Sequence, residues 1–333
     1  MGVRVLAPGR VNLIGDHTDY TGGYVLPMAV QLGTTVEAVH HGEAVHLTSD
    51  HDPRAAVVPL DVADPQSVDP PWARYVAGVV AEIRPSTALR GRVSTTLPIG
   101  AGLSSSAALE VAVAVALGHP GPPLELARAC QRAEQRASGV PCGIMDQLTS
   151  AAGQAGHALL IDCSCDSIRP IRRPEGIEIV AVHSGQTRGL AGSAYAERRA
   201  DCDEVARLIG PLRGATLSDL TAVSNPRLRR RARHVITENA RVLAFAEAWE
   251  GGDMRAAGEL MEASHESLRH DFEVSSPALD DLVDRLHRTP GVFGARLTGA
   301  GFGGCAVALA EPGALPVGWR LEAAGPAGLV GGD

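Results

Sequence analysis

The chain has 333 residues and a net charge of −8, and all 30 of its basic residues are arginines because it contains no lysine. This acidic balance argues against general binding to nucleic acid or to anionic membranes, and no apolar run is long enough to cross a bilayer. The six cysteines are scattered without a C-x-x-C pair and no signal peptide is recognised, so we expect reduced thiols and a cytoplasmic protein.

The first element is a predicted strand over residues 3–7, which should end at Pro8-Gly9. Residues 9–24 then place an arginine, two aspartates and a histidine among several glycines, more polar groups than a plain turn needs. Glycines let a backbone approach a ligand closely, so we favour a binding loop over a hairpin with solvated charges.

Short strands are predicted over residues 25–30, 34–40 and 44–48, followed by a loop-rich connection over 50–69. Residues 71–83 are predicted to form a helix that has Trp72 near its start. A single tryptophan of this kind is either a core aromatic or a platform for a flat ring.

Residues 93–117 are the stretch around which the chain is organised. A β-branched run over 93–97 predicts a strand, 98–105 is a Gly/Ser loop, and 107–117 is an apolar segment that suits a buried helix. A glycine loop that leads into a helix start can bind phosphate, although a serine-capped core helix fits the same pattern. A Walker A loop is excluded because it needs lysine, and Ser105 stands where a dinucleotide fingerprint needs glycine.

A helix predicted over 124–136 carries Glu134 near its end, and a Gly/Pro-rich turn over 138–147 leads into a further helix start. Asp146 at this start is either a polar cap or a functional carboxylate. Residues 153–156 are the predicted hinge between the two halves of the chain.

In the second half, we predict a strand over 177–182 and helices over 192–209, 234–249 and 254–271, the first of which carries Tyr195. The arginine run over 227–233 fits a solvated helix face better than a nucleic-acid site in an acidic chain.

Residues 298–305 contain a G-x-G-x-x-G pattern between predicted strands 294–297 and 305–310. Because a strand rather than a helix follows, the pattern does not predict a dinucleotide site. We expect these glycines to pack closely against the active site. Residues 312–333 lack a convincing helix, and the sequence contains no metal-site spacing.

Three segments, 9–20, 98–108 and 298–305, together resemble the signature motifs of the GHMP small-molecule kinases, and the first is close to that of galactokinases. Residues 142–147 resemble the galactokinase segment that carries the catalytic aspartate. The resemblance implies an α/β (α+β) protein with two domains and the site between them. The first, residues 1–153, would be ribosomal-protein-S5-like, and the second, residues 154–333, ferredoxin-like.

The resemblance further implies an ATP-dependent, Mg²⁺-requiring kinase that phosphorylates the anomeric (C1) hydroxyl of galactose. Asp146, with Arg10 beside it, would take the hydroxyl proton or mainly orient the hydroxyl. The implied sugar-binding residues are Arg10, Asp16, His17, Asp19, Gly143, Asp146 and Tyr195. The implied ATP-binding residues are Trp72, Gly100, Ala101, Gly102, Leu103, Ser104, Ser105, Ser106 and Ala107, and the implied Mg²⁺ ligands are Ser106 and Glu134.

One departure concerns the substrate, because galactokinases usually have glutamate where this chain has Asp16. A related GHMP sugar kinase acting on another aldose, such as N-acetylgalactosamine, is therefore an alternative. A non-catalytic sugar sensor on the same fold is disfavoured because the serine loop and Asp146 are intact. We expect a monomer without nucleic-acid or membrane partners.

Overall fold

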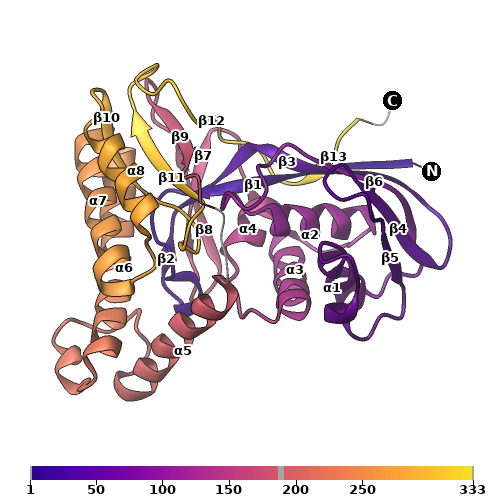
Figure 1. Ribbon diagram of the computed structural model, residues 1–333, viewed down its shortest axis with the longest axis horizontal. Helices are drawn as coiled ribbons and strands as arrows, with labels where there is room; N and C mark the ends of the chain where they lie inside the picture. Colours follow the sequence, from indigo (N-terminus) through magenta and orange to yellow (C-terminus); the bar gives the residue numbers. More distant parts are fainter. Residues whose placement is uncertain (1, 187–190, 332–333) are drawn as a thin grey trace.

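The computed structural model describes residues 2–186 and 191–331. Within these residues, sheets of six, four and three strands are covered by helices (Figure 1). The six-stranded sheet has the order β13–β1–β3–β6–β4–β5. Its strands are Gly2–Asn12 (β1), Pro27–His40 (β3), Ala44–Ser49 (β4), Ala56–Pro59 (β5), Leu89–Thr95 (β6) and Gly328–Leu329 (β13).

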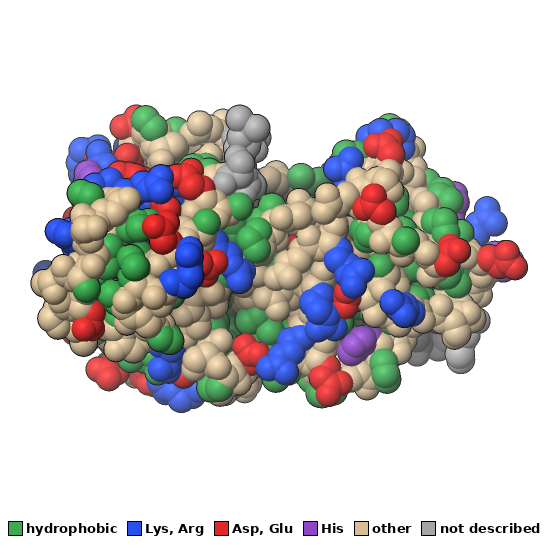
Figure 2. All heavy atoms as spheres, turned by 90° about the horizontal axis from the view of Figure 1, so that it is seen from below, with side chains coloured by type: hydrophobic (Ala, Val, Ile, Leu, Met, Phe, Trp, Pro, Cys, Tyr) green, Lys and Arg blue, Asp and Glu red, His purple; other side chains and the backbone are tan. Residues whose placement is uncertain are grey.

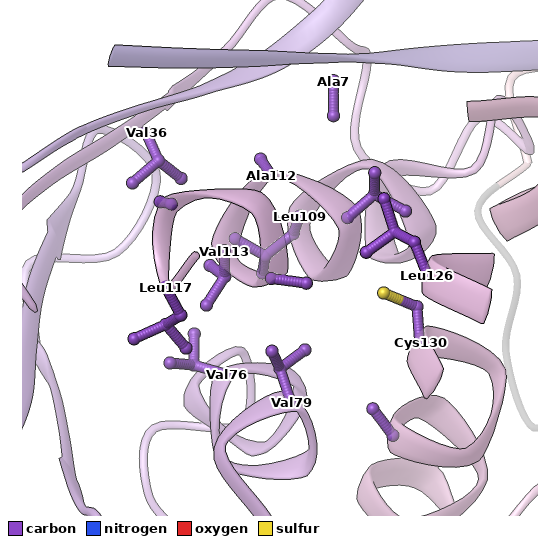
Figure 3. Packing of buried hydrophobic residues seen from close by; sticks show 14 of the residues in the cluster. Ala7, Val36, Val76, Val79, Leu109, Ala112, Val113, Leu117, Leu126 and Cys130 are labelled. Atoms are coloured by element: carbon purple, nitrogen blue, oxygen red, sulfur yellow. The ribbon is translucent and has the colours of Figure 1, made fainter. Parts of the chain in front are cut away.

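Three helices contact this sheet: Ala73–Ile83 (α1), Ser105–Ala116 (α2) and Met145–Ala152 (α4). A fourth helix, Pro123–Ser138 (α3), packs against these three. Helix α2 lies at the centre of the first core, where its apolar residues meet strands on one side and helices α1 and α3 on the other (Figure 3). Because almost every α2 side chain is buried, its sequence is apolar all round rather than striped.

The remaining strands form two smaller sheets, with the orders β10–β11–β9–β12 and β2–β7–β8. These strands are Tyr24–Val25 (β2), His157–Asp162 (β7), Ser167–Arg172 (β8), Glu178–His183 (β9), Val292–Leu297 (β10), Cys305–Ala310 (β11) and Trp319–Leu321 (β12). The helices of this half are Ala191–Ile209 (α5), Pro226–Glu250 (α6), Met254–Ser267 (α7) with a π-helical turn over Leu268–Phe272, and Pro277–His287 (α8). Short 3-10 turns complete the chain at Asp19–Thr21, Pro65–Ser67 and Asp219–Ala222.

The predicted mixture of helices and strands is confirmed, but some boundaries are wrong. Strand β1 does not end at Pro8-Gly9, because a register shift between Pro8 and Arg10 lets its pairing with β3 continue to Asn12. The strands predicted separately over 25–30 and 34–40 are largely one long strand, β3. Strands β5, β7 and β8 and helix α8 are not among the predicted elements.

The division at residues 153/154 remains a prediction. Strands from both sides of it pair with each other, because β2 pairs with β7 and the C-terminal β13 pairs with β1. Both ends of the chain therefore lie on the same side of the molecule (Figure 1). No helix of the described residues is both long enough and apolar enough to span a bilayer.

Helix α7 approaches strand β10 through a pair of glycines. A Cβ atom on Gly258 would lie 1.9 Å from the Phe293 carbonyl oxygen, and one on Gly294 would lie 2.4 Å from the Gly258 Cα. Only glycine allows this approach, which fixes β10 and therefore the glycine-rich segment that follows it.

We predict that Gly258→Ala lowers the free energy of unfolding by about 1–3 kcal/mol, because the helix must move away from the strand. Urea denaturation would measure this loss. Gly325→Ala is the matched control, since a Cβ there meets no atom within 4 Å, and its effect should stay within about 0.5 kcal/mol. Equal stability of the two variants would contradict the packing argument.

Candidate active site

A cavity of about 310 Å³ is lined by segments that are far apart in the sequence. Its walls come from the end of β1 and the loop after it, the Gly/Ser loop before α2, the end of α3, the start of α4, helix α5 and the glycine-rich segment after β10. The predicted site residues that line it are Arg10, Asp16, His17, Asp19, Gly100, Gly102, Ser104, Ser105, Ser106, Glu134, Gly143, Asp146 and Tyr195.

Asp146 and Arg10 form an ion pair at the centre of the cavity. The Arg10 Nε donates to Asp146 Oδ1 at 2.8 Å, and Nη2 lies 2.6 Å from the same oxygen. Arg10 also donates to the Gly102 carbonyl oxygen at 2.7 Å, while the Ser104 hydroxyl donates to Asp146 Oδ2. The carboxylate is therefore fixed beside the Gly/Ser loop by Arg10 on one oxygen and by Ser104 on the other.

The Gly/Ser loop presents the start of α2 to the cavity. Ser104, the residue before the helix, has a positive φ of 60°, which is an uncommon backbone conformation for a residue with a side chain. Its hydroxyl binds Asp146 instead of capping the helix, so the amide groups of the first turn remain available to an anion. The other loop residues divide into two groups: Gly100, Gly102, Ser105 and Ser106 line the cavity, whereas Ala101, Leu103 and Ala107 are buried in the core.

Glu134 lies at the other side of this helix start. Its carboxylate accepts hydrogen bonds from the Ser106 hydroxyl at 3.0 Å and from the Gln147 amide, which also donates to the fully buried Glu110 at 3.1 Å. Burial and the nearby negative charge of Asp146 raise the pKa of Glu134 to about 7. Burial, together with the nearby charge of Glu134, also raises the pKa of Glu110 well above its ordinary value.

The Ser106–Glu134 pair suits Mg²⁺, which prefers carboxylate and hydroxyl oxygens and keeps water or phosphate for its other positions. Within the described residues, no three His, Cys, Asp or Glu side chains converge as a metal site.

His17 and Tyr195 form an aromatic wall of the cavity, with ring centroids 5.4 Å apart. The His17 ring is held at both nitrogens, since Nε2 lies 3.3 Å from the Ala300 carbonyl and Nδ1 lies 3.1 Å from the Tyr20 hydroxyl. A carbonyl only accepts, so Nε2 carries a hydrogen.

Asp19 belongs to the binding loop predicted over residues 9–24, called the sugar loop below, and lies beside Gly143 in the cavity. A Cβ atom on Gly143 would lie 1.9 Å from Asp19 Oδ2, so any side chain there would displace the Asp19 carboxylate. Burial and the charge of Asp146 raise the pKa of Asp19 to about 6.

Asp16 lines the cavity, but its carboxylate is only 2% exposed and is bound by the chain itself. Arg296 donates to Oδ2 at 2.5 Å, and the Gly299 amide donates to Oδ1 at 3.0 Å. Burial raises the pKa of Asp16, although the Arg296 guanidinium opposes this shift.

Trp72 is not among the residues that line the cavity. Its indole N–H donates to the Arg54 carbonyl at 3.2 Å, and its ring packs against the first core. Tyr75, one turn further along α1, lines the cavity instead. Tyr75 and Arg296 were missed in the sequence analysis. Tyr75 follows Trp72 by three residues, a spacing that places two side chains on the same face of a helix. Arg296 is a charged residue in the otherwise apolar strand β10, a sign that it needs a buried partner.

The arginines near the start of α6 form ion pairs with acidic side chains of the same chain. These ion pairs include Arg227–Asp201, Arg230–Glu273, Arg231–Glu273, Arg231–Asp201 and Arg233–Asp271. The expectation of a solvated face is wrong for Arg231, whose side chain is 1% exposed. Basic and acidic side chains are also interspersed over the face shown in Figure 2, which gives no support to a nucleic-acid site.

Three parts of the chain match known families. Residues 3–39 match the galactokinase galactose-binding signature, residues 74–154 the N-terminal domain of GHMP kinases, and residues 243–316 their C-terminal domain. The galactokinase of Bos taurus is 45% identical over 333 residues, covering 94% of this chain and 84% of that protein. The galactokinase of Chloroflexus aurantiacus is 43% identical over 335 residues, covering 91% and 82%.

The fold also matches solved structures. The crystal structure of Lactococcus lactis galactokinase complexed with galactose has a TM-score of 0.92 and 30% identity, covering 99% of this chain and 95% of that one. A mevalonate kinase structure, at 20% identity and a TM-score of 0.67, shares the fold, covering 94% of this chain and 92% of that one. The expected GHMP kinase fold is thus confirmed.

The raised pKa of Asp19 predicts that this residue destabilises the folded protein at neutral pH. Because its folded-state pKa of about 6 exceeds the ordinary value of 3.8, the folded protein binds the extra proton. The unfolding free energy therefore falls as pH rises through that interval. Asp19→Asn should raise stability at pH 7.5 by about 1–3 kcal/mol, allowing for partial solvent screening, and leave it unchanged near pH 4.

Thermal or urea unfolding of the two proteins at both pH values measures this difference. Asp61→Asn, at an exposed position, is the control and should change stability by less than about 0.5 kcal/mol at either pH. A pH-independent effect of Asp19→Asn would contradict the prediction.

Proposed function

We propose that this chain, which belongs to the galactokinase family of GHMP kinases, transfers the γ-phosphoryl group of ATP to the C1 hydroxyl of galactose. The products are galactose 1-phosphate and ADP. One observation carries the proposal: the Asp146 carboxylate is fixed by Arg10 and Ser104 on the same cavity wall as the start of α2. A base and an anion site therefore meet in one cavity.

On the acceptor side, Asp146 orients the sugar hydroxyl and accepts its proton at a carboxylate oxygen. Arg10 holds Oδ1, so Oδ2, whose partner is the rotatable Ser104 hydroxyl, is the oxygen that takes the proton. His17, Asp19, Tyr195 and the Gly143 backbone surround the same space and would bind the sugar hydroxyls. Fixing the hydroxyl in line with the phosphate supplies much of the catalysis in phosphoryl transfer.

On the donor side, the first-turn amides of α2 and the loop from Gly100 to Ser106 would hold the ATP phosphates. The positive end of the helix dipole stabilises their negative charge. Tyr75 of α1 lies in the cavity wall. Trp72, which directly precedes α1 and does not line the cavity, remains a predicted neighbour of the adenine ring.

Ser106 and Glu134 would hold Mg²⁺, whose charge neutralises the phosphates when it is bound. Glu134 is suited to this because its buried carboxylate lies near other negative charges, and a cation would favour its ionised form. Gln147 donates to Glu134 from behind and orients the carboxylate.

Asp146→Asn should lower kcat with ATP and galactose by about 100- to 10,000-fold, because the amide cannot take the hydroxyl proton. A coupled ADP-release assay across several aldoses measures this and also identifies the preferred sugar. Asp50→Asn is the control, since Asp50 binds Arg92 on the surface and its loss should leave kcat unchanged. Near-normal turnover by Asp146→Asn would rule out the proposed role.

Glu134→Gln should raise the Mg²⁺ concentration that gives half-maximal rate by about 10-fold or more, because a charged ligand is lost. Rates measured against Mg²⁺ at saturating galactose would show this. Glu82→Gln is the matched control, because Glu82 is similarly buried but pairs with Arg132 and Arg136 outside the cavity. An unchanged Mg²⁺ dependence in Glu134→Gln would contradict the assignment.

A further inference from the structure

The carboxylate of Asp16 is held within the protein at both of its oxygens. Arg296 binds Oδ2 and the Gly299 amide binds Oδ1, although these residues lie some 280 positions away in the sequence. The backbone of Asp16 is fixed as well, since His234 Nε2 donates to its carbonyl oxygen at 3.1 Å. With 2% of the residue exposed, its contacts are overwhelmingly internal.

Arg296 connects Asp16 to a second buried carboxylate. Its guanidinium donates to the Leu13 carbonyl at 3.1 Å and lies 3.9 Å from Glu238 Oε1. The same Glu238 oxygen accepts the Gly15 amide hydrogen at 3.0 Å. Arg296 therefore lies between two carboxylates that each hold the sugar loop, and all three groups are essentially inaccessible to water.

The residues that follow Arg296 form hydrogen bonds with other residues in and beside the sugar loop. The Thr298 hydroxyl donates to the Asn12 carbonyl at 2.9 Å and accepts the Asn12 amide hydrogen at 3.2 Å. The Ala300 carbonyl accepts a hydrogen bond from His17 at 3.3 Å. The segment from residue 296 to residue 300 thus determines where the loop places His17 in the cavity.

We propose that Asp16 is a positioning residue, which fixes the sugar loop to β10 and its glycine segment, and that it does not itself bind a sugar hydroxyl. The proposal rests on the proposed function, because it assigns a role within sugar binding. The two roles differ in a measurable way. A hydroxyl ligand discriminates at one position of the sugar, whereas a positioning residue affects every position equally through His17 and Asp19.

The experiment compares galactose with its 2-, 3-, 4- and 6-deoxy derivatives in the wild type, Asp16→Asn, Arg296→Lys and the double variant. Asparagine retains the shape of Asp16, and lysine retains the charge of Arg296, so both variants should fold. The matched controls are Asp201→Asn and Arg231→Met. They alter an equally buried Asp–Arg pair, with Nε and Oδ2 3.5 Å apart, outside the cavity.

We expect Asp16→Asn to lower kcat/KM for galactose at least 10-fold and to lower it by the same factor, within twofold, for each deoxy sugar. The KM for ATP should change less than twofold. The double variant should lose less than the product of the two single losses, because both substitutions break one contact. The control variants should keep the galactose KM within twofold of the wild type, whatever they do to stability.

Three results would overturn the proposal. In the first, Asp16→Asn loses the preference for galactose over one particular deoxy sugar, which would make Asp16 a hydroxyl ligand. In the second, the loss of kcat/KM in the double variant equals the product of the two single losses, which would show that Asp16 and Arg296 act independently. In the third, the control variants raise the galactose KM as much as Asp16→Asn does, which would make the effect general destabilisation.

The activity of the wild type toward different aldoses tests the proposed function separately. A wild type that turns over another aldose in place of galactose would overturn that function. The same comparison with deoxy forms of that aldose would still decide the role of Asp16.

Discussion

The ion pair between Arg10 and Asp146 is the contact on which the rest of the site depends. It joins the first strand to the start of α4, across 136 residues of sequence, and Arg10 also holds the Gly102 carbonyl of the phosphate loop. Because the arginine side chain is only 5% exposed, its charge needs this partner, and removal of Asp146 would leave a buried positive charge without it. One guanidinium thereby aligns the proposed catalytic carboxylate with the loop that would bind phosphate.

The cavity concentrates negative charge that the protein alone does not neutralise. Burial and repulsion by Asp146 raise the pKa of Asp19 to about 6 and that of Glu134 to about 7. Such carboxylates lower the stability of the folded protein at neutral pH, and this cost is common at functional sites. A divalent cation and the hydrogen-bond-donating hydroxyls of a sugar are the groups that would relieve it, so these carboxylates favour a cation and a sugar.

The two halves of the chain contribute differently to the cavity. Residues before 153 supply the proposed base, the Gly/Ser loop and the proposed Mg²⁺ ligands, whereas α5, α6, β10 and the segment after β10 supply contacts that hold the sugar loop. The glycine contact between α7 and β10 fixes the position of Arg296 and hence of the loop. A residue outside the cavity can therefore affect sugar binding without touching the sugar.

The sequence by itself determined the features whose requirements are local. The Gly/Ser loop before α2, the buried helix after it and the placement of Asp146 at a helix start follow from residue type and spacing. Only the tertiary structure decided which charges meet. It directs the Asp16 carboxylate to Arg296 and Gly299 and brings Tyr75 rather than Trp72 to the cavity. It also pairs the buried Arg231 of α6 with Glu273 of the same chain. These outcomes depend on contacts between residues far apart in the chain, and no local pattern encodes which partner a buried charge will find.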